Sequence, residues 1–371
     1  PRTDHNARIE QAGMVVASRT DPANTNIAFT VREITSEVTI VATANSPASV
    51  DILEIAGVDR VLQLGEILGT AMAARSLGLG GRTQAIGGFG DLLIAEAGIV
   101  GTDLVGQTLA EAQLRARLGV GIVGVWQRGE FEIATVDTRL EDSTILLLAR
   151  TEDQLSAFDE HHSAQIHDEN TAVIIGGGRV GRAIGRAYEA AGIDYTIVEK
   201  LAERQREGVS YVIGDAADRA VLDEAGINEA EAVLVTTHDD DVNVYLTRYC
   251  RGLRPQGRII SRARLDRNVS TLYRAGADAV LSYAATGSTA IWNEFRGGGT
   301  VLVAEGLRVV RTEVPPNLVG RTLADTHVHR RTGCNVVAIQ TEAGTTITPD
   351  PHQSLPAEAR LILVGTDESL S

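Results

Sequence analysis

The chain has 371 residues, which exceeds one ordinary domain and suggests two to four domains of ~100 to 150 residues each. Its 43% hydrophobic and 22% charged residues are typical of a globular protein and argue against disorder. The net charge of -15 repels phosphate backbones and anionic lipid surfaces, so we expect no nucleic acid partner. Cys250 and Cys334 form no CxxC motif, which argues against a zinc site or a disulfide framework and suits a reducing cytosol.

The chain repeats itself. "AGVDRVL" at 56–62 matches "AGADAVL" at 275–281, an offset of 275 − 56 = 219 that also relates the flanking residues. Further along, "LVGQTLA" from Leu104 matches "LVGRTLA" from Leu318 at an offset of 318 − 104 = 214. Because the two offsets differ by five, each repeat has two parts with a joint of variable length between them.

The second repeat begins near Thr171 and alternates short apolar runs with helical patterns. This alternation predicts a doubly wound parallel α/β sheet of Rossmann type, with five crossovers between six strands. The predicted strands are Ala172–Ile175, Tyr195–Val198, Tyr211–Ile213, Ala232–Thr237, Arg258–Ser261 and Ala279–Leu281.

The first repeat has no counterpart of this opening, so we expect an N-terminally truncated copy of the same sheet. It retains runs at Met14–Ala17, Thr39–Ala42 and Val61–Leu64, which correspond to the last units of the second repeat. Such a half sheet would leave apolar faces without neighbours. We therefore expect the missing segment to lie elsewhere in the natural chain, or another subunit to supply its place.

A small α+β subdomain is expected after each sheet, with a strand, a helix and two or three further strands. The polar stretch "DEHHSAQIHDEN" at 159–170 is predicted to be a linker. The expected organisation is 1–80 for the truncated first sheet with a crossover helix, 81–158 for the first small subdomain, 159–170 for the linker, 171–297 for the second sheet, and 298–371 for the second small subdomain.

A glycine motif opens the second repeat. Gly176, Gly178 and Gly181 form GxGxxG between a predicted strand and a predicted helix, and Glu199 ends the next strand. Glycines let the backbone approach a pyrophosphate at the helix N-terminus, and the acid can accept hydrogen bonds from ribose hydroxyls. Together with Asp215 after the third strand, the motif predicts nucleotide binding, and Glu199 disfavours the 2′-phosphate of NADP. The alternative is a purely structural glycine turn.

Other polar residues each allow two interpretations. Arg179 could reach phosphate oxygens from the glycine turn or could be a solvated side chain. Asp239 is expected to cap a helix rather than to bind a metal. Trp126 and Trp292 are expected in the core or at an interface. We predict no metal site from the histidines, which are His161, His162, His167, His327 and His329.

In its order of parts the chain resembles the domains that regulate the conductance of potassium (RCK, or TrkA-N plus TrkA-C), found in Trk-type and Ktr-type subunits and in gating rings of prokaryotic channels. The resemblance covers nearly the whole chain. It rests on "VIIGGGRVGRAIG" at 173–185, "VEK" at 198–200, "VIGDAAD" at 212–218, "VLVTTHDDDVNVYL" at 233–246 and "AGADAVLS" at 275–282.

The resemblance implies a site for NAD(H), ADP or ATP. Its wall would contain Gly176, Gly178, Arg179, Val180, Glu199, Lys200, Asp215, Thr236 and Thr237. Calcium-gated relatives place carboxylates after the fifth strand, where this chain has Thr43 and Asn45 in one repeat and Arg262 and Arg264 in the other, so that calcium site is not expected.

The function implied is a cytoplasmic gating module at the inner face of the membrane, and not an enzyme. It would form a homo-oligomeric ring, a tetramer of tandem modules, that acts on a potassium channel pore. A soluble Trk-type subunit acting on a transporter membrane subunit is the first alternative; an NAD-dependent oxidoreductase and a passive scaffold are others. For association between chains we expect an interface on the helix with Ala290, Ile291 and Trp292, and on its first-repeat counterpart at 67–77.

Overall fold

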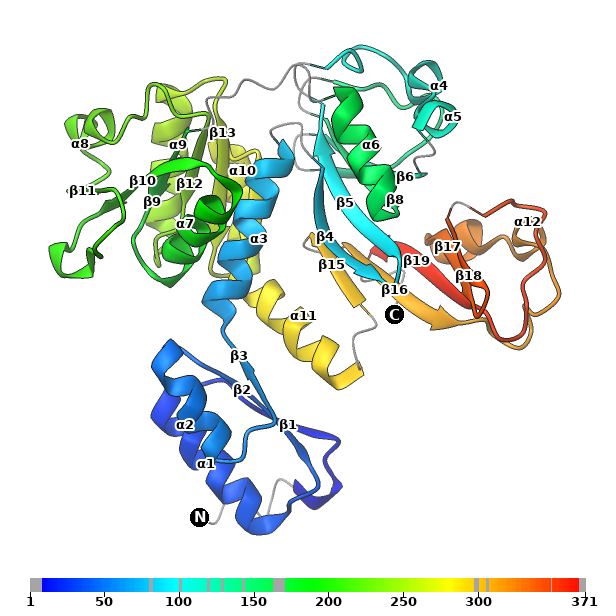
Figure 1. Ribbon diagram of the computed structural model, residues 1–371, viewed down its shortest axis with the longest axis horizontal. Coiled ribbons are helices and arrows are strands. Elements are labelled where there is room, and N and C mark those ends of the chain that lie inside the picture. Colours follow the sequence, from blue (N-terminus) through cyan, green and yellow to red (C-terminus); the bar gives the residue numbers. More distant parts are fainter. Residues whose placement is uncertain are drawn as a thin grey trace.

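The fold is taken from a computed structural model (Figure 1). It describes residues 9–79, 83–99, 102–118, 121–127, 130–141, 144–162, 171–296, 300–304, 307–347 and 349–366. Within these residues the strands form four sheets, one parallel and one antiparallel sheet for each repeat.

The second repeat contains the complete predicted sheet. Its six strands run parallel in the order β11-β10-β9-β12-β13-β14, which is the Rossmann order and confirms the predicted fold class. The strands are β9 (Thr171–Ile175), β10 (Asp194–Glu199), β11 (Tyr211–Ile213), β12 (Ala232–Val235), β13 (Arg258–Ala263) and β14 (Ala279–Ser282). The helices are α7 (Arg179–Ala191), α8 (Arg219–Glu224), α9 (Asp240–Leu253), α10 (Val269–Ala275) and α11 (Tyr283–Arg296), with short 3-10 turns at Ala202–Arg204 and Asp266–Asn268.

The first repeat forms a parallel sheet of three strands in the order β1-β2-β3. Its elements are β1 (Met14–Ala17), β2 (Thr39–Thr43), β3 (Arg60–Leu62), α1 (Asp21–Ile34), α2 (Val50–Ile55) and α3 (Leu64–Leu79), with 3-10 turns at Ile9–Gln11 and Pro47–Ser49. Ile40, Ala42 and Leu53 belong to the core between the sheet and helices α1 and α2.

The same hydrogen bonds recur in both sheets at an offset of 219. The Asn24 amide donates to the Thr43 carbonyl at 2.8 Å, and the Asn243 amide donates to the Arg262 carbonyl at 2.9 Å. Asp21 accepts from the backbone N–H groups of residues 45 and 46, and Asp240 accepts from those of residues 264 and 265. The repetition detected in the sequence is therefore a repetition of structure.

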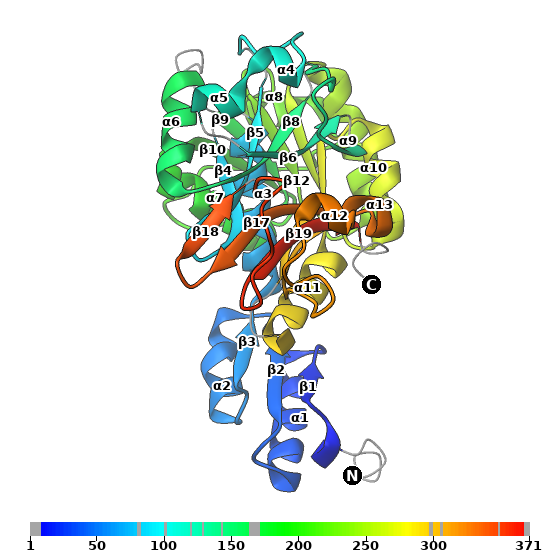
Figure 2. The same ribbon diagram turned by 90° about the vertical axis from the view of Figure 1, so that its right-hand side faces the viewer.

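The last helix of each sheet packs against the other repeat. Helix α3 leaves the first sheet and lies along α7 of the second repeat, and α11 lies against the first sheet (Figures 1 and 2). Ala290 and Ile291 of α11 contact the cluster that includes Val41 and Leu62. The second repeat therefore covers one face of the half sheet. Among the described residues no strand pairs with the outer edge of β1, so the expectation that strands are missing beside it stays a prediction.

The helices that we expected to join separate chains instead join the two repeats of one chain. On α3, Leu68, Met72 and Ala73 are buried in the core shared with the second repeat. Trp292 on α11 is 41% exposed, whereas Trp126 is buried as predicted. These faces therefore give no evidence about association between chains.

Each small subdomain is an antiparallel sheet of five strands, more than the three or four that we expected. The strand orders are β4-β5-β8-β6-β7 and β15-β16-β19-β17-β18. The first subdomain contains β4 (Gln84–Phe89), β5 (Leu92–Gly98), α4 (Leu109–Ala112), α5 (Leu114–Leu118), β6 (Gly121–Gln127), β7 (Glu130–Ile133), β8 (Ile145–Arg150) and α6 (Glu152–His162). The second contains β15 (Thr300–Ala304), β16 (Leu307–Glu313), α12 (Leu323–Thr326), α13 (Val328–Thr332), β17 (Asn335–Thr341), β18 (Gly344–Ile347) and β19 (Arg360–Thr366).

The single helix expected in the second small subdomain is two short helices, α12 and α13, which are separated at His327, whose φ is +48°. The first subdomain has the same break at Gln113, also with φ +48°. A non-glycine residue in the left-handed region ends a helix, and these two residues lie 214 positions apart, at the offset of the small subdomains. Thr108 and Thr322 cap the corresponding first helices.

Residues 159–162 of the predicted linker continue helix α6, because the helix runs to His162. The rest of that linker, including His167, lies outside the described residues. The domain limits given above stay a prediction. No helix in the part of the chain that the structure describes is both long enough and apolar enough to cross a bilayer.

Candidate functional site

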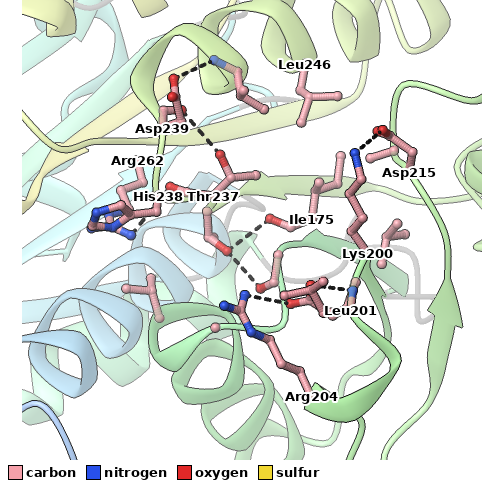
Figure 3. Close-up of a pocket in the computed structure, with 18 of the residues that line it drawn as sticks. Ile175, Lys200, Leu201, Arg204, Asp215, Thr237, His238, Asp239, Leu246 and Arg262 are labelled. Carbon is pink, nitrogen blue, oxygen red and sulfur yellow. Dashed lines mark hydrogen bonds and ion pairs between the residues drawn. The ribbon is translucent and has the colours of Figure 1, made fainter.

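A pocket of about 880 Å³ opens at the carboxyl ends of β9, β10, β12 and β13. In a doubly wound sheet this edge, at the point where the strand order reverses, is where ligands bind. All of the predicted site residues except Gly181 line it (Figure 3). Those that do are Gly176, Gly178, Arg179, Val180, Glu199, Lys200, Asp215, Thr236 and Thr237.

The glycine turn between β9 and α7 forms the floor of the pocket. Gly176 has φ +112°, which favours glycine, and the Thr236 hydroxyl donates to its carbonyl at 3.1 Å. A Cβ on Gly178 would meet no atom within 4 Å, so a side chain there would enter the pocket. A Cβ on Gly181 would overlap the Gly176 carbonyl, so this third glycine serves the packing of helix on strand.

Glu199 is buried at the end of β10 and orders the turn. One carboxylate oxygen accepts from the Gly177 N–H at 2.9 Å, and the other accepts from the Leu201 N–H at 3.0 Å. Arg204 lies 3.5 Å from the first oxygen. Each carboxylate oxygen has two lone pairs, so the second oxygen, which accepts from the Leu201 N–H, can still accept a hydrogen bond from a ribose hydroxyl.

One end of the pocket combines an ion pair with apolar side chains. Lys200 and Asp215 form an exposed ion pair of 2.8 Å there; this pairing raises the pKa of Lys200 and lowers that of Asp215. The sequence did not single out the apolar side chains beside this pair, since alanine, leucine and valine carry no motif. They are Leu201, Ala216, Ala217, Val242 and Leu246.

Asp239 caps α9, as predicted. Its carboxylate accepts from the N–H groups of Asp241 at 2.9 Å and Val242 at 3.2 Å. Thr237 beside it donates to Asn243 Oδ1 at 2.6 Å. Within the described residues, no three histidine, cysteine or acidic side chains gather as a metal site would require.

The opposite end of the pocket is built from both repeats. Arg179 donates from one guanidinium nitrogen to the backbone carbonyl and to Oδ1 of Asn45 in the first repeat. His238 and Arg262 lie at this end, across the pocket from Lys200 and Asp215 (Figure 3). Sequence reasoning noted Arg262 only as the loss of a calcium ligand.

The lining of the pocket has a charge opposite to that of the whole chain. It contains five cations and three acids, a formal balance of 5 − 3 = +2, in a chain of net charge -15. The cations are Arg179, Arg182, Lys200, Arg204 and Arg262, and the acids are Glu199, Asp215 and Asp239. Such a surface attracts an anionic ligand.

Comparison with known families agrees with this geometry. The TrkA-N domain model matches residues 2–64 and 172–283, and the TrkA-C domain model matches 96–162 and 307–371. The chain belongs to the TrkA-N and TrkA-C, or RCK, family. The tandem arrangement of RCK repeats predicted from the sequence is thereby confirmed.

Two solved structures resemble the whole RCK chain. The crystal structure of the GsuK RCK domain is 34% identical, with a TM-score of 0.69 over 98% of this chain and 80% of that one. The GsuK channel bound to NAD is also 34% identical, with a TM-score of 0.67 over 98% of this chain and 66% of that one.

Curated relatives are named for potassium systems. "Probable potassium channel protein 2" of Methanocaldococcus jannaschii is 25% identical over 53% of this chain and 64% of its own length. "Trk system potassium uptake protein TrkA" of Azorhizobium caulinodans is 26% identical over 81% of this chain and 68% of its own length. The chain thus spans less than two thirds of the channel protein.

Proposed function

We propose that this RCK chain is a ligand-sensing gating module that binds NAD(H), ADP or ATP in the second repeat and regulates potassium flux through a membrane pore. The observation that carries the proposal is the pocket itself, where a glycine turn, a buried ribose acceptor and five cations converge in an acidic chain. The relatives named above support the link to potassium.

The packing of α7 on α3 gives a route by which nucleotide binding in the pocket would affect the first repeat. Helix α7 begins at the glycine turn, and α3 of the first repeat lies against its first turns at Gly69. A Cβ on Gly69 would lie 2.5 Å from the Ala183 Cβ and 2.7 Å from the Val180 carbonyl oxygen. Because contact this close leaves no slack, a shift of α7 would move α3 with it.

Helix α3 is in turn held to the first small subdomain. Arg75 of α3 forms an ion pair with Glu96 of β5, and both side chains are buried. Burial raises the pKa of Glu96, and Arg75 opposes that rise. Removing one partner of a buried ion pair strongly destabilises a protein, because it leaves a buried charge unpaired. We therefore expect the Arg75–Glu96 pair to hold α3 and β5 together when either element moves.

Regulation suits the chain better than catalysis. A dehydrogenase carries a separate substrate domain beside its cofactor domain. Here each parallel sheet is accompanied instead by the same kind of five-stranded module. We therefore propose that the chain is not an enzyme, and we place it on the cytoplasmic side of the membrane.

We further propose that the chain forms a homo-oligomeric ring, a tetramer of tandem modules. Helices α1 and α2 of the first repeat expose three apolar side chains, Phe29, Ile52 and Ile55, which are 51%, 55% and 81% exposed. At the offset of 219 the second repeat has Arg248, Thr271 and Arg274. Apolar side chains that are this exposed suit contact with another protein surface.

A soluble Trk-type subunit is the second candidate. It is favoured by the uptake protein of Azorhizobium caulinodans, whose match extends over 81% of this chain. The channel is favoured by the higher identity to GsuK over 98% of the chain.

Potassium flux in a host deficient in potassium uptake tests the proposal. The complete gene should restore flux, and Gly178→Val, whose side chain would enter the pocket over the glycine turn, should abolish its dependence on nucleotide. Gly252→Ala is the matched control, because a Cβ on this helical glycine of α9 meets no atom within 4 Å. Restoration that requires a co-expressed membrane subunit would favour the Trk version. Flux that is the same with Gly178→Val as with the wild type would contradict nucleotide control.

A further inference from the structure

Arg262 is the least solvated cation of the pocket. It lies near the end of β13, is 7% exposed, and stacks over the Tyr283 ring with 4.9 Å between guanidinium carbon and ring centroid. Its one hydrogen bond among the described residues is a 3.4 Å contact to the Thr237 carbonyl, and its Nε is buried without an acceptor. Burying a cation with so few hydrogen bonds costs free energy, and an anion bound beside it would offset that cost.

No carboxylate in the described part of the chain pairs with Arg262. The acid whose charge acts on Arg262 is Asp240, and its oxygens already accept from the Arg264 N–H, the Leu265 N–H and Asn268. Asp239 is engaged as the cap of α9. Neither acid forms an ion pair with Arg262, although the charge of Asp240 partly opposes the lowering of the Arg262 pKa.

Further positive charge surrounds the same end of the pocket. The pKa of His238 is lowered first by burial and then by three neighbouring arginines. Burial likewise lowers the pKa of Arg262, and two of those arginines add to the effect. The three are Arg179, Arg262 and Arg264. Their combined field points to a ligand that is negative at this end.

The positive charge at the Arg262 end of the pocket favours nucleotides that carry negative charge at that end. An adenosine placed at Glu199, with its first phosphates at the glycine turn, has its remaining part directed towards Arg262 and His238 (Figure 3). In ADP and ATP that part is phosphate. In NAD⁺ it is a nicotinamide riboside, whose ring is positively charged.

We propose that Arg262, with Arg179 and His238, forms a subsite for the terminal phosphate of an adenosine polyphosphate, so that the pocket takes ATP in preference to NAD⁺. The inference rests on the proposed function, since it needs a nucleotide in this pocket. It concerns the second repeat alone, because the first repeat has Thr43 at the position of Arg262.

Calorimetric titration of AMP, ADP, ATP and NAD⁺ into the wild-type chain, in EDTA, tests the subsite. Affinity should rise along the series AMP, ADP, ATP, and ATP should bind more tightly than NAD⁺. Arg262→Gln should weaken the binding of ATP about 10- to 100-fold, which is the range for the loss of one hydrogen bond to a charged group. It should change the affinity for AMP by less than about threefold. Arg274→Gln is the matched control, because Arg274 is exposed, does not line the pocket and is not among the arginines that act on His238, and it should change the affinity for ATP by less than about threefold.

The outcomes separate the two proposals. Failure of every nucleotide to bind the wild-type chain would overturn the proposed function itself. Binding with no gain from AMP to ATP, or with NAD⁺ tighter than ATP, would overturn the subsite and leave nucleotide binding intact. The wild-type series also decides the matter if Arg262→Gln fails to fold.

Discussion

In the first repeat, Asp59 pairs with Arg32 at 2.6 Å and accepts from the Ile40 N–H at 2.7 Å. In the second, Asp278 pairs with Arg251 at 2.6 Å and accepts from the Ile259 N–H at 2.7 Å. The two sheets thus share these internal hydrogen bonds position by position.

The strand ends do not match in the same way. The second repeat has Arg262 and Arg264 at the end of β13, where the first has Thr43 and Asn45 at the end of β2. Asn45 instead accepts hydrogen bonds from Arg179 of the second repeat. The contrast teaches that the hydrogen bonds of Asp59 and Asp278 are kept between the repeats, whereas the position of Arg262, which lines the pocket of the second repeat, differs.

The largest effect should come from the contact that joins the repeats. Gly69→Ala should lower the free energy of unfolding by about 1–3 kcal/mol, because the new Cβ has no room against α7. Thermal unfolding should show a loss of about 2–4 °C for each kcal/mol. Gly252→Ala, a helical glycine with open space around it, should be neutral or slightly stabilising. Equal effects at the two glycines would contradict close packing of α3 on α7.

A smaller effect should follow from removing the shared acceptor in either sheet. Asp59→Ala should speed hydrogen exchange at the Ile40 amide about tenfold, and Asp278→Ala should do the same at Ile259, as expected for a lost hydrogen bond worth ~1.4 kcal/mol. Asp194→Ala, at the exposed start of β10, serves as the control. If hydrogen exchange became faster in one repeat and not in the other, the two hydrogen bonds would have the same geometry but would contribute differently to stability.

Most of the second sheet was predictable because its evidence is local. Apolar runs followed by helical periodicity predicted β9 to β14, and the glycine spacing predicted the turn that the structure shows. The cover of the half sheet by α11 was not predictable, because it depends on a contact between segments over 200 residues apart.

The predicted site residues share one pocket apart from Gly181, but the sequence could not show how they are engaged. That Glu199 holds two backbone N–H groups, and that Arg179 reaches Asn45, follow only from the assembled fold. The predicted preference for NAD(H) or ADP/ATP over NADP still rests on Glu199.

The measurement that tests nucleotide sensing most directly is calorimetric titration of ATP, ADP, NADH and NADPH into the wild-type chain and into Gly178→Val and Gly252→Ala. At least one adenine nucleotide should bind the wild type and the Gly252→Ala control equally, with NADPH weaker than NADH. Gly178→Val should weaken that binding by at least about 100-fold, because its side chain would occupy the space over the glycine turn where the phosphates must lie. Unchanged affinity in Gly178→Val, with the variant folded like the wild type, would contradict a nucleotide site in the second repeat.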